Sequence, residues 1–317
     1  MTSDSQWTVE PGEGGARLAA FLAAAGRLVT RGRAVWALER GKVFVNDEEA
    51  TRADAARRLV AGDRIRVWMD RPGSARRRAS LHQVGALDVL YEDDDLMAVN
   101  KAAGMLAVPL VRGGEVAVSV LGMLKQYFRA DRRRGPFVVH RIDRDTSGVV
   151  LFAKHGAAQA RLKQQFLHRE PERTYQAVVY GHFSPPAGSW RDRLVWDDRA
   201  LAQRVAPARD RRGREAITEY RTLERYRDAS LVEVRLVTGK QHQIRVQAAL
   251  RGHPLVGERR YTSDAAGPRQ IAFPRQALHA CRLAFEHPTT GHRLTVEAPL
   301  PADLVTLVAR LRRSASR

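Results

Sequence analysis

The sequence of 317 residues contains a single cysteine, Cys281, so it can form neither an internal disulfide nor a cysteine-rich metal site. It also lacks an apolar run long enough to cross a membrane. The short apolar stretch over residues 18–25 follows Glu10 and Glu13, where a signal peptide would carry cations. None of the ten histidines falls in a metal-ligand motif. We therefore expect a cytoplasmic protein without a metal.

Acidic residues are scarce relative to basic ones. The chain has 54 Lys and Arg against 35 Asp and Glu, which gives a formal net charge of +19. A coding bias toward arginine would explain Arg in place of Lys, but it would not explain an excess of cations over anions. The charge favours a polyanionic partner, and it favours nucleic acid over an anionic membrane surface. The 44% share of hydrophobic residues is enough for a small domain and a large one.

Local patterns predict helices near the N-terminus. Residues 1–14 are polar and rich in glycine, and we expect a flexible tail there. Apolar residues at i, i+3 and i+4 predict a short helix that begins at Leu18. Thr30 is a suitable N-cap for a second helix, which ends at Gly41.

Strands expected over 43–47 and 64–68 complete a small α/β domain over residues 15–70. Cations cluster around its second helix, where only Glu39 opposes them, and such clustering suits contact with RNA phosphates. A solvated helix face is the alternative. The candidate RNA-binding residues here are Arg27, Arg31, Arg33, Arg40 and Lys42.

Two short motifs in this region carry a resemblance. "GKVFVN" over 41–46 and "AGDRIRV" over 61–67, preceded by two helices, are similar to the S-four-type RNA-binding domain. The match covers residues 15–68. It implies that the N-terminal domain binds RNA.

Residues 71–86 begin with Pro, Gly, Ser and unopposed arginines, which is typical of a linker, and a second domain follows over 87–317. Its alternating strands and helices predict an α+β fold with a mixed, largely antiparallel sheet. Strands are expected over 149–153, 175–180, 231–236 and 294–296, and helices over 159–168 and 244–250. Arginine-rich stretches at 129–134 and 204–214 are expected to be exposed loops that are available to RNA.

The most informative segment is the polar loop "HRIDRDTSG" over 140–148, which leads into the buried strand. Loops on a rigid scaffold often carry catalytic groups. Asp143 lies between Arg141 and Arg144, and neighbouring cations favour an ionised carboxylate that is suited to nucleophilic attack. A surface ion pair is the alternative interpretation.

This loop resembles the "HRLD-x-x-TSG" signature of the RluA-type pseudouridine synthases. Three further stretches agree in order, and closing strands over 277–301 are also similar, so the resemblance covers roughly residues 87–305. The three stretches are "VNKAAGMLAVP" at 99–109, "RTYQAVVYG" at 173–181 and "LVTGKQHQIRVQAALRGHPLVG" at 236–257. Departures from the family pattern are Ile142 for leucine, Ala102 for proline, Lys240 for arginine and Gln247 for histidine.

The resemblance implies a long bent sheet with the catalytic Asp143 in its central cleft. It places Tyr175 in the pocket, where the ring stacks on a flipped uracil and the hydroxyl helps to remove the C5 proton; a core aromatic is the alternative. It gives Arg245 a salt bridge to Asp143, with a phosphate clamp as the alternative. Arg141 fills the gap that the flipped base leaves, or contacts a backbone phosphate. Arg144 and Lys240 complete the candidate RNA contacts.

The implied reaction turns a uridine into pseudouridine in place, and it needs no cofactor. Attack of Asp143 on the sugar carbon, attack on the base, and abstraction of a sugar proton all stay open. The resemblance implies large-subunit ribosomal RNA as the first substrate, with transfer RNA as the alternative, and we expect a monomer. The rival interpretations are an inactive RNA-binding factor and a hydrolase that releases the base.

Overall fold

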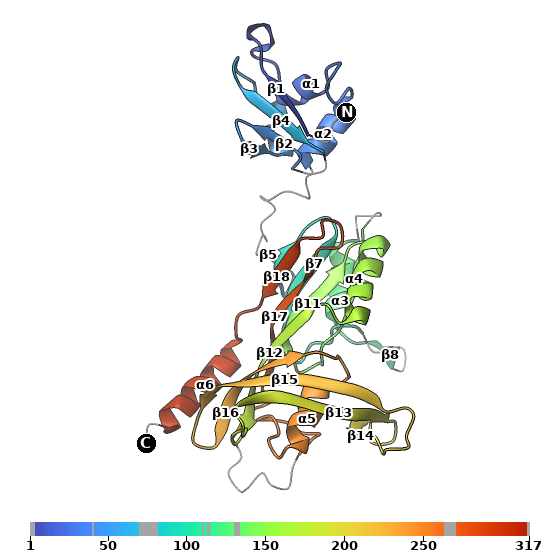
Figure 1. Cartoon of the computed structure of the whole chain (residues 1–317), viewed down its shortest axis with the longest axis vertical. Helices are drawn as coiled ribbons and strands as arrows, with labels where there is room; N and C mark the ends of the chain where they lie inside the picture. The colour runs from blue at the N-terminus through green and yellow to red at the C-terminus, as the bar shows by residue number, and fades with distance from the viewer. Residues whose placement is uncertain are drawn as a thin grey trace. The chain divides into compact units, whose positions relative to one another are not determined.

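The computed structural model describes residues 4–39, 41–69, 82–109, 111–112, 115–129, 134–262 and 271–315. The chain divides into two compact units, the first formed by residues 1–78 with 289–292 and the second by residues 79–288 and 293–317 (Figure 1). Each unit has its own hydrophobic core. Within the described ranges, no helix is both long and apolar enough to cross a membrane.

The first unit packs two short helices against a four-stranded sheet. Its strands run in the order β1-β4-β2-β3, with β1 at Asp4–Thr8, β2 at Val43–Val45, β3 at Glu48–Ala50 and β4 at Arg64–Trp68. The α-helices are α1 at Leu18–Leu22 and α2 at Arg31–Glu39, and short 3-10 helices lie at Pro11–Glu13 and Arg52–Ala56. Thr30 Oγ1 accepts a hydrogen bond from the N–H of Arg33 at 3.2 Å, so the predicted cap of α2 is confirmed.

The predicted tail over residues 1–14 is wrong where the structure describes it. Residues 4–8 form β1, which pairs antiparallel with β4 over five residues. A pairing between segments some 60 residues apart leaves no local signal in a polar sequence such as DSQWT. The predicted linker over 71–86 is also wrong at its end, because His82–Val84 forms strand β5; its residues 71–81 lie outside the described ranges.

A single sheet of twelve strands dominates the second unit. Its main path is β14-β13-β15-β16-β12-β17-β11-β7-β6-β5, with β10 beside β11 and β18 beside β17. All the neighbouring pairs are antiparallel except β11 with β17. The strand direction changes across the sheet, so that β13 and β15 run nearly across the direction of β7 and β11 (Figure 1).

Four strands of this unit lie where the sequence predicts them. The four expected strands fall within β11 at Ser147–Ala153, β12 at Glu172–Tyr180, β16 at Ala229–Leu236 and β18 at Arg293–Glu297. The others are β6 at Leu87–Glu92, β7 at Leu96–Lys101, β10 at Phe137–Val138, β13 at Ala187–Asp197, β14 at Ala202–Val205, β15 at Arg214–Arg225 and β17 at Leu278–Glu286. A separate hairpin joins β8 at Val111–Arg112 to β9 at Glu115–Val116.

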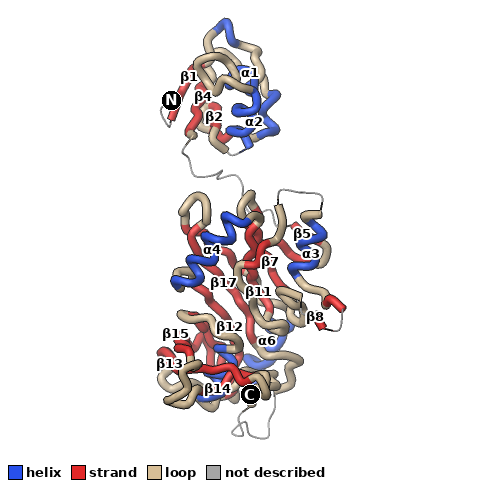
Figure 2. Tube along the Cα trace, turned by 90° about the vertical axis from the view of Figure 1, so that its right-hand side faces the viewer, coloured by secondary structure: helices blue, strands red, loops and turns tan. Residues whose placement is uncertain are grey.

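Helices cover both faces of the sheet. They are α3 at Val120–Tyr127, α4 at Gly156–His168, α5 at Gln243–Leu250 and α6 at Ala302–Ala315. Helix α3 packs on one face of β7 and β11, whereas α4 packs on the other (Figure 2). Every residue of β11 is buried, as its continuous apolar run predicts. The structure confirms the α+β class.

The arginine-rich stretches are only partly loops. In the stretch 204–214, the first two residues belong to β14 and the last begins β15, with turns between them. In the stretch 129–134, residues 130–133 lie outside the described ranges.

Candidate active site

The loop over residues 140–146 reaches the site from the start of β11. The loop begins at His140, whose side chain anchors it: Nε2 accepts the backbone N–H of Leu151 at 3.0 Å, and the ring stacks on Phe166. Burial lowers the pKa of His140 to about 3, so the imidazole is neutral. Ile142 is buried in the core, whereas the side chain of Asp143 is 21% exposed and faces two cavities.

A buried lysine and a buried arginine hold the backbone of this loop. Lys101 is fully buried, and its ammonium donates to the carbonyl of Arg144 at 2.8 Å and to two other carbonyls. Burial lowers the pKa of Lys101 to about 7, although the carboxylates of Asp145 and Asp143 oppose the shift. Arg275 donates to the carbonyl of Asp145 at 3.1 Å. The loop therefore has a fixed shape before any ligand binds.

Asp143 pairs with Arg245, which lies 102 residues further along the chain. Arg245 Nη1 is 3.2 Å from Asp143 Oδ2. The other two nitrogens of the guanidinium bind Glu258, with Nε to Oε2 and Nη2 to Oε1 both at 2.7 Å. Although burial opposes its charge, the two carboxylates raise the pKa of Arg245 above its ordinary value. Arg144, the neighbour in sequence, pairs with Asp145 instead.

His242 lies on the other oxygen of the same carboxylate. Its Nε2 is 3.9 Å from Asp143 Oδ1, and its Nδ1 hydrogen-bonds the hydroxyl of Tyr261 at 2.9 Å. The residue precedes α5 with a left-handed φ of 56°, which turns the chain into the helix that carries Arg245. Burial lowers the pKa of His242, although Asp143 opposes the shift, so the ring is neutral near pH 7.

Tyr175 is part of the wall of the first cavity. This cavity has a volume of about 650 Å³, and its lining includes Asp143, Arg245, Arg141 and Lys240. The side chain of Tyr175 is 8% exposed. Burial raises the pKa of its phenol to about 12, with the Asp143 carboxylate adding to the shift and Arg173 opposing it.

The structure brings together the three predicted catalytic residues, Asp143, Tyr175 and Arg245, around this one pocket. The predicted RNA contacts Arg141 and Lys240 line the same pocket, and Arg144 lines the second cavity.

The predicted contacts of the first unit differ from one another. Arg31 and Arg33 are exposed, and Lys42 is half-buried. Arg27 forms its bonds within its own domain: it pairs with Glu13 at 2.6 Å and donates to the carbonyl of Phe21 at 2.9 Å. Arg40 lies outside the described residues.

Glu258 is the functional residue that the sequence analysis missed. Its side chain is 1% exposed, and Oε1 also accepts the backbone N–H groups of Arg259, Arg260 and Tyr261 at 3.1, 2.8 and 3.3 Å. The signal available in the sequence was an acidic residue directly after Gly257, where the last quoted motif ends. Gly257 has φ of +75°, and a Cβ there would lie 2.0 Å from the carbonyl oxygen of Arg275, so the turn requires glycine.

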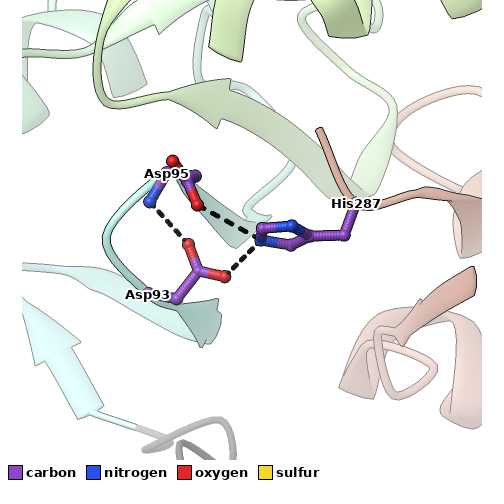
Figure 3. A group of neighbouring side chains, drawn as sticks. All are labelled: Asp93, Asp95 and His287. Carbon is purple, nitrogen blue, oxygen red and sulfur yellow. Dashed lines mark hydrogen bonds and ion pairs between the residues drawn. The ribbon is translucent and has the colours of Figure 1, made fainter. Parts of the chain in front are cut away.

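Among the described residues, Asp93, Asp95 and His287 have the donor atoms and spacing of a metal site (Figure 3). Their donors already bind one another, because His287 Nε2 is 2.7 Å from Asp93 Oδ2 and the N–H of Asp95 donates to Asp93 Oδ1 at 2.8 Å. Tyr91 donates a further hydrogen bond to Asp93 at 2.7 Å. The cluster ties the turn between β6 and β7 to the end of β17.

Comparison with known proteins gives consistent matches. Residues 95–250 match the family described as RNA pseudouridylate synthase. The chain is 37% identical over 278 residues to a Bacillus subtilis protein named uncharacterized RNA pseudouridine synthase YlyB, covering 86% of this chain and 87% of that protein. It is 34% identical over 291 residues to ribosomal large subunit pseudouridine synthase D of Vibrio cholerae, covering 88% of this chain and 86% of that protein.

Solved structures with the same fold include human RNA pseudouridylate synthase domain containing 4. That match has a TM-score of 0.58 and 22% identity, and it covers 71% of this chain and 92% of the human one. A second human protein, RNA pseudouridylate synthase domain containing 1, matches with a TM-score of 0.56 and 24% identity, covering 73% of this chain and 96% of the human one. The predicted fold is confirmed.

Proposed function

This chain belongs to the RNA pseudouridylate synthase family, and on that premise we propose that it converts a uridine of large-subunit ribosomal RNA to pseudouridine with Asp143 as its catalytic carboxylate. One observation carries the residue assignment. Asp143 is a half-buried carboxylate that opens onto a pocket of about 650 Å³ and is held by an arginine whose own plane is fixed by Glu258. Such a group is preorganised for attack on a ligand in the pocket.

The reaction breaks the bond from N1 of uracil to C1′ of the ribose and forms a bond from C5 to C1′. The C5 proton is lost and N1 gains a proton, so atoms and charge balance without a cofactor. Asp143 starts this sequence as nucleophile or base. Arg245 orients the carboxylate, and the neutral His242 beside the second oxygen limits its rotation.

Tyr175 supplies a flat surface for the flipped uracil in the first cavity, which we call the base pocket. Base–aromatic stacking contributes about 1–3 kcal/mol per base, which offsets part of the few kcal/mol needed to unstack the uridine from RNA. With its pKa raised to about 12, the phenol stays protonated at pH 7. We therefore assign the hydroxyl to hydrogen bonding rather than to removal of the C5 proton.

Arg141 is placed to replace the flipped base. Its side chain is exposed and lines both cavities, two residues before Asp143. A guanidinium plane stacks well on bases, so it can occupy the gap in the RNA while the uridine lies in the pocket.

The choice of ribosomal RNA is supported by relatives that are named ribosomal large subunit pseudouridine synthase D. We further propose that residues 15–70 form an S-four-type RNA-binding domain in which the exposed Arg31 and Arg33 bind phosphates, with Lys42 beside them. A ribosomal RNA substrate would place the enzyme in the cytoplasm. We propose a monomer, since the charge of +19 makes copies repel one another.

Incubation of the purified protein with an unmodified large-subunit ribosomal RNA transcript tests the proposal. We expect pseudouridine at one or a few mapped positions, with no free uracil and no abasic site. Free uracil would identify a hydrolase, and binding without any modification would identify an RNA-binding factor. Modification of transfer RNA with none in the ribosomal transcript would overturn the substrate assignment alone.

A further inference from the structure

A second cavity, with a volume of about 1180 Å³, adjoins the base pocket. The two cavities meet at Asp143. They share six lining residues, namely Arg141, Ile142, Asp143, Gln241, His242 and Arg245. A uridine in the base pocket stays covalently joined to its neighbours in the RNA, and the second cavity lies directly beside Asp143, where such neighbours could be bound.

The charge of the second cavity suits a phosphate backbone. Arg259 and Arg260 line it and are exposed, and no carboxylate of the described residues forms an ion pair with either guanidinium. Exposed arginines elsewhere on this unit, such as Arg221 and Arg312, pair with glutamates. Cations without a carboxylate partner on the protein are those that a polyanion neutralises on binding.

The two arginines are held in place without using all their donors. Arg259 Nη2 donates to the carbonyl of Pro274 at 2.9 Å, and Arg260 Nη1 donates to the carbonyl of Leu201. A guanidinium has five N–H donors, so several stay available for phosphate oxygens. The backbone N–H groups of the same two residues bind Glu258, which fixes the loop that carries them.

Apolar side chains give the cavity a surface for bases as well. Trp196, on β13, lines it, and its ring packs edge-on against His242 with 5.8 Å between centroids. Leu201, in the turn after β13, is 50% exposed in the same lining. Aromatic and cationic side chains side by side are characteristic of surfaces that bind single-stranded RNA.

We propose that the second cavity binds the RNA strand that directly flanks the target uridine, with Arg259 and Arg260 on its phosphates and Trp196 on a base. This inference rests on the proposed function and deepens it, because it assigns part of the substrate to a place on the protein. It also places strand binding on the loop whose Glu258 fixes Arg245, so strand contact and the geometry of Asp143 share one element.

A cycle that combines a protein change with an RNA change tests the proposal. The protein change is R259Q/R260Q in the full chain. The matched control is R225Q/R227Q, which removes two exposed cations near the turn between β15 and β16 that line neither cavity. The RNA is an oligonucleotide around the uridine that the wild-type enzyme modifies in the ribosomal transcript, together with versions trimmed on the 5′ or the 3′ side.

We expect R259Q/R260Q to raise Kd for the untrimmed oligonucleotide roughly tenfold. The salt slope, which is the slope of log Kd against log salt concentration, should fall by about 1.4, or 0.7 for each lost phosphate contact. Trimming one flank should weaken the wild type and the control but cost R259Q/R260Q nothing more, because the partner of the arginines is already gone. Any fall in kcat should be smaller than the rise in Kd.

Three results would overturn the proposal: equal loss of affinity in R259Q/R260Q and R225Q/R227Q, an equal effect of both trims in all proteins, or a fall in kcat at unchanged Kd. Failure of the proposed function gives a different outcome, since the wild type would then make no pseudouridine in the transcript.

Discussion

Each nitrogen of the Arg245 guanidinium binds its own carboxylate oxygen. Nε and Nη2 bind the two oxygens of Glu258, and Nη1 binds Asp143. A bidentate pair fixes both the plane and the direction of a guanidinium. Glu258 thereby acts as a positioning residue for Asp143, which it reaches only through Arg245, and its loss should affect catalysis.

We predict that Glu258→Gln lowers kcat at least roughly tenfold while RNA affinity stays within about twofold. The neutral amide leaves the buried Arg245 without its main charge partner, so the free energy of unfolding should fall by about 3 kcal/mol. Urea unfolding and single-turnover pseudouridylation measure the two effects. Glu258→Asp keeps the charge and should recover part of kcat; an Asp variant no better than Gln would contradict the positioning role.

The raised pKa of Tyr175 predicts how the single-turnover rate depends on pH. Because burial raises its pKa to about 12, the hydroxyl stays protonated throughout the range in which RNA is stable enough to assay. A step that needed the phenolate would speed up tenfold per pH unit, or roughly 300-fold between pH 7 and 9.5. We predict that the single-turnover rate rises by less than about threefold over this range. A log-linear rise that Tyr175→Phe removes would identify the phenolate as the base instead.

At this scale the sequence predicted Asp143, Tyr175 and Arg245 through resemblance to a family, and their roles remain predictions. The local sequence placed Arg144 beside the carboxylate, but Arg144 pairs with Asp145, whereas the partner Arg245, 102 residues away, was predicted through the resemblance alone. Neighbours in sequence do not define neighbours in a sheet of twelve strands, and for the same reason Glu258 was missed.

Strand β11 is the element on which the site depends. It follows the catalytic loop directly, and its pairing with β17 joins the two parts of the sheet. Gly148 faces Ala280 across this parallel pair with φ of +115°. A Cβ at this position would lie 2.1 Å from the carbonyl oxygen of Ala280, a distance that no rotamer relieves.

We therefore predict that Gly148→Ala lowers the free energy of unfolding by about 4 kcal/mol or prevents folding of the second unit. Gly156→Ala is the matched control, because a Cβ there meets no atom within 4 Å and the residue begins α4. It should be neutral or stabilising by up to about 1 kcal/mol. Urea unfolding of both variants measures the difference; a Gly148→Ala protein as stable as the control would show that the two backbones can separate freely.

Elements with a strong local pattern were predictable. The apolar run of β11 and the cap of α2 are examples. Strand β1 was not predictable, because its residues carry no alternation and only pairing with β4 makes them a strand. Strand β5 was not predictable either, because it ends a segment with linker composition and becomes a strand by pairing with β6.

On the scale of the whole molecule, the chain combines two units with separate cores. The base pocket and the second cavity are lined by residues of the second unit alone. The first unit is therefore expected to add RNA affinity rather than chemistry.

We predict that deletion of residues 1–78 preserves kcat on a short oligonucleotide but raises KM for the full ribosomal transcript roughly tenfold and lowers the salt slope of binding. The full-length variant R31Q/R33Q should show a smaller change in the same direction. Equal modification of the transcript by truncated and full-length enzyme at low concentration would mean that the first unit has another role.

The catalytic role of Asp143 is the central claim, and pseudouridine formation by Asp143→Asn tests it most directly. The measurement is single-turnover pseudouridine yield on the ribosomal transcript at saturating enzyme, with Asp228→Asn, an exposed carboxylate distant in sequence, as control. We predict that the Asp143→Asn protein binds the transcript within a few-fold of wild type and makes no pseudouridine, whereas the control behaves as wild type. Turnover by Asp143→Asn would contradict the account.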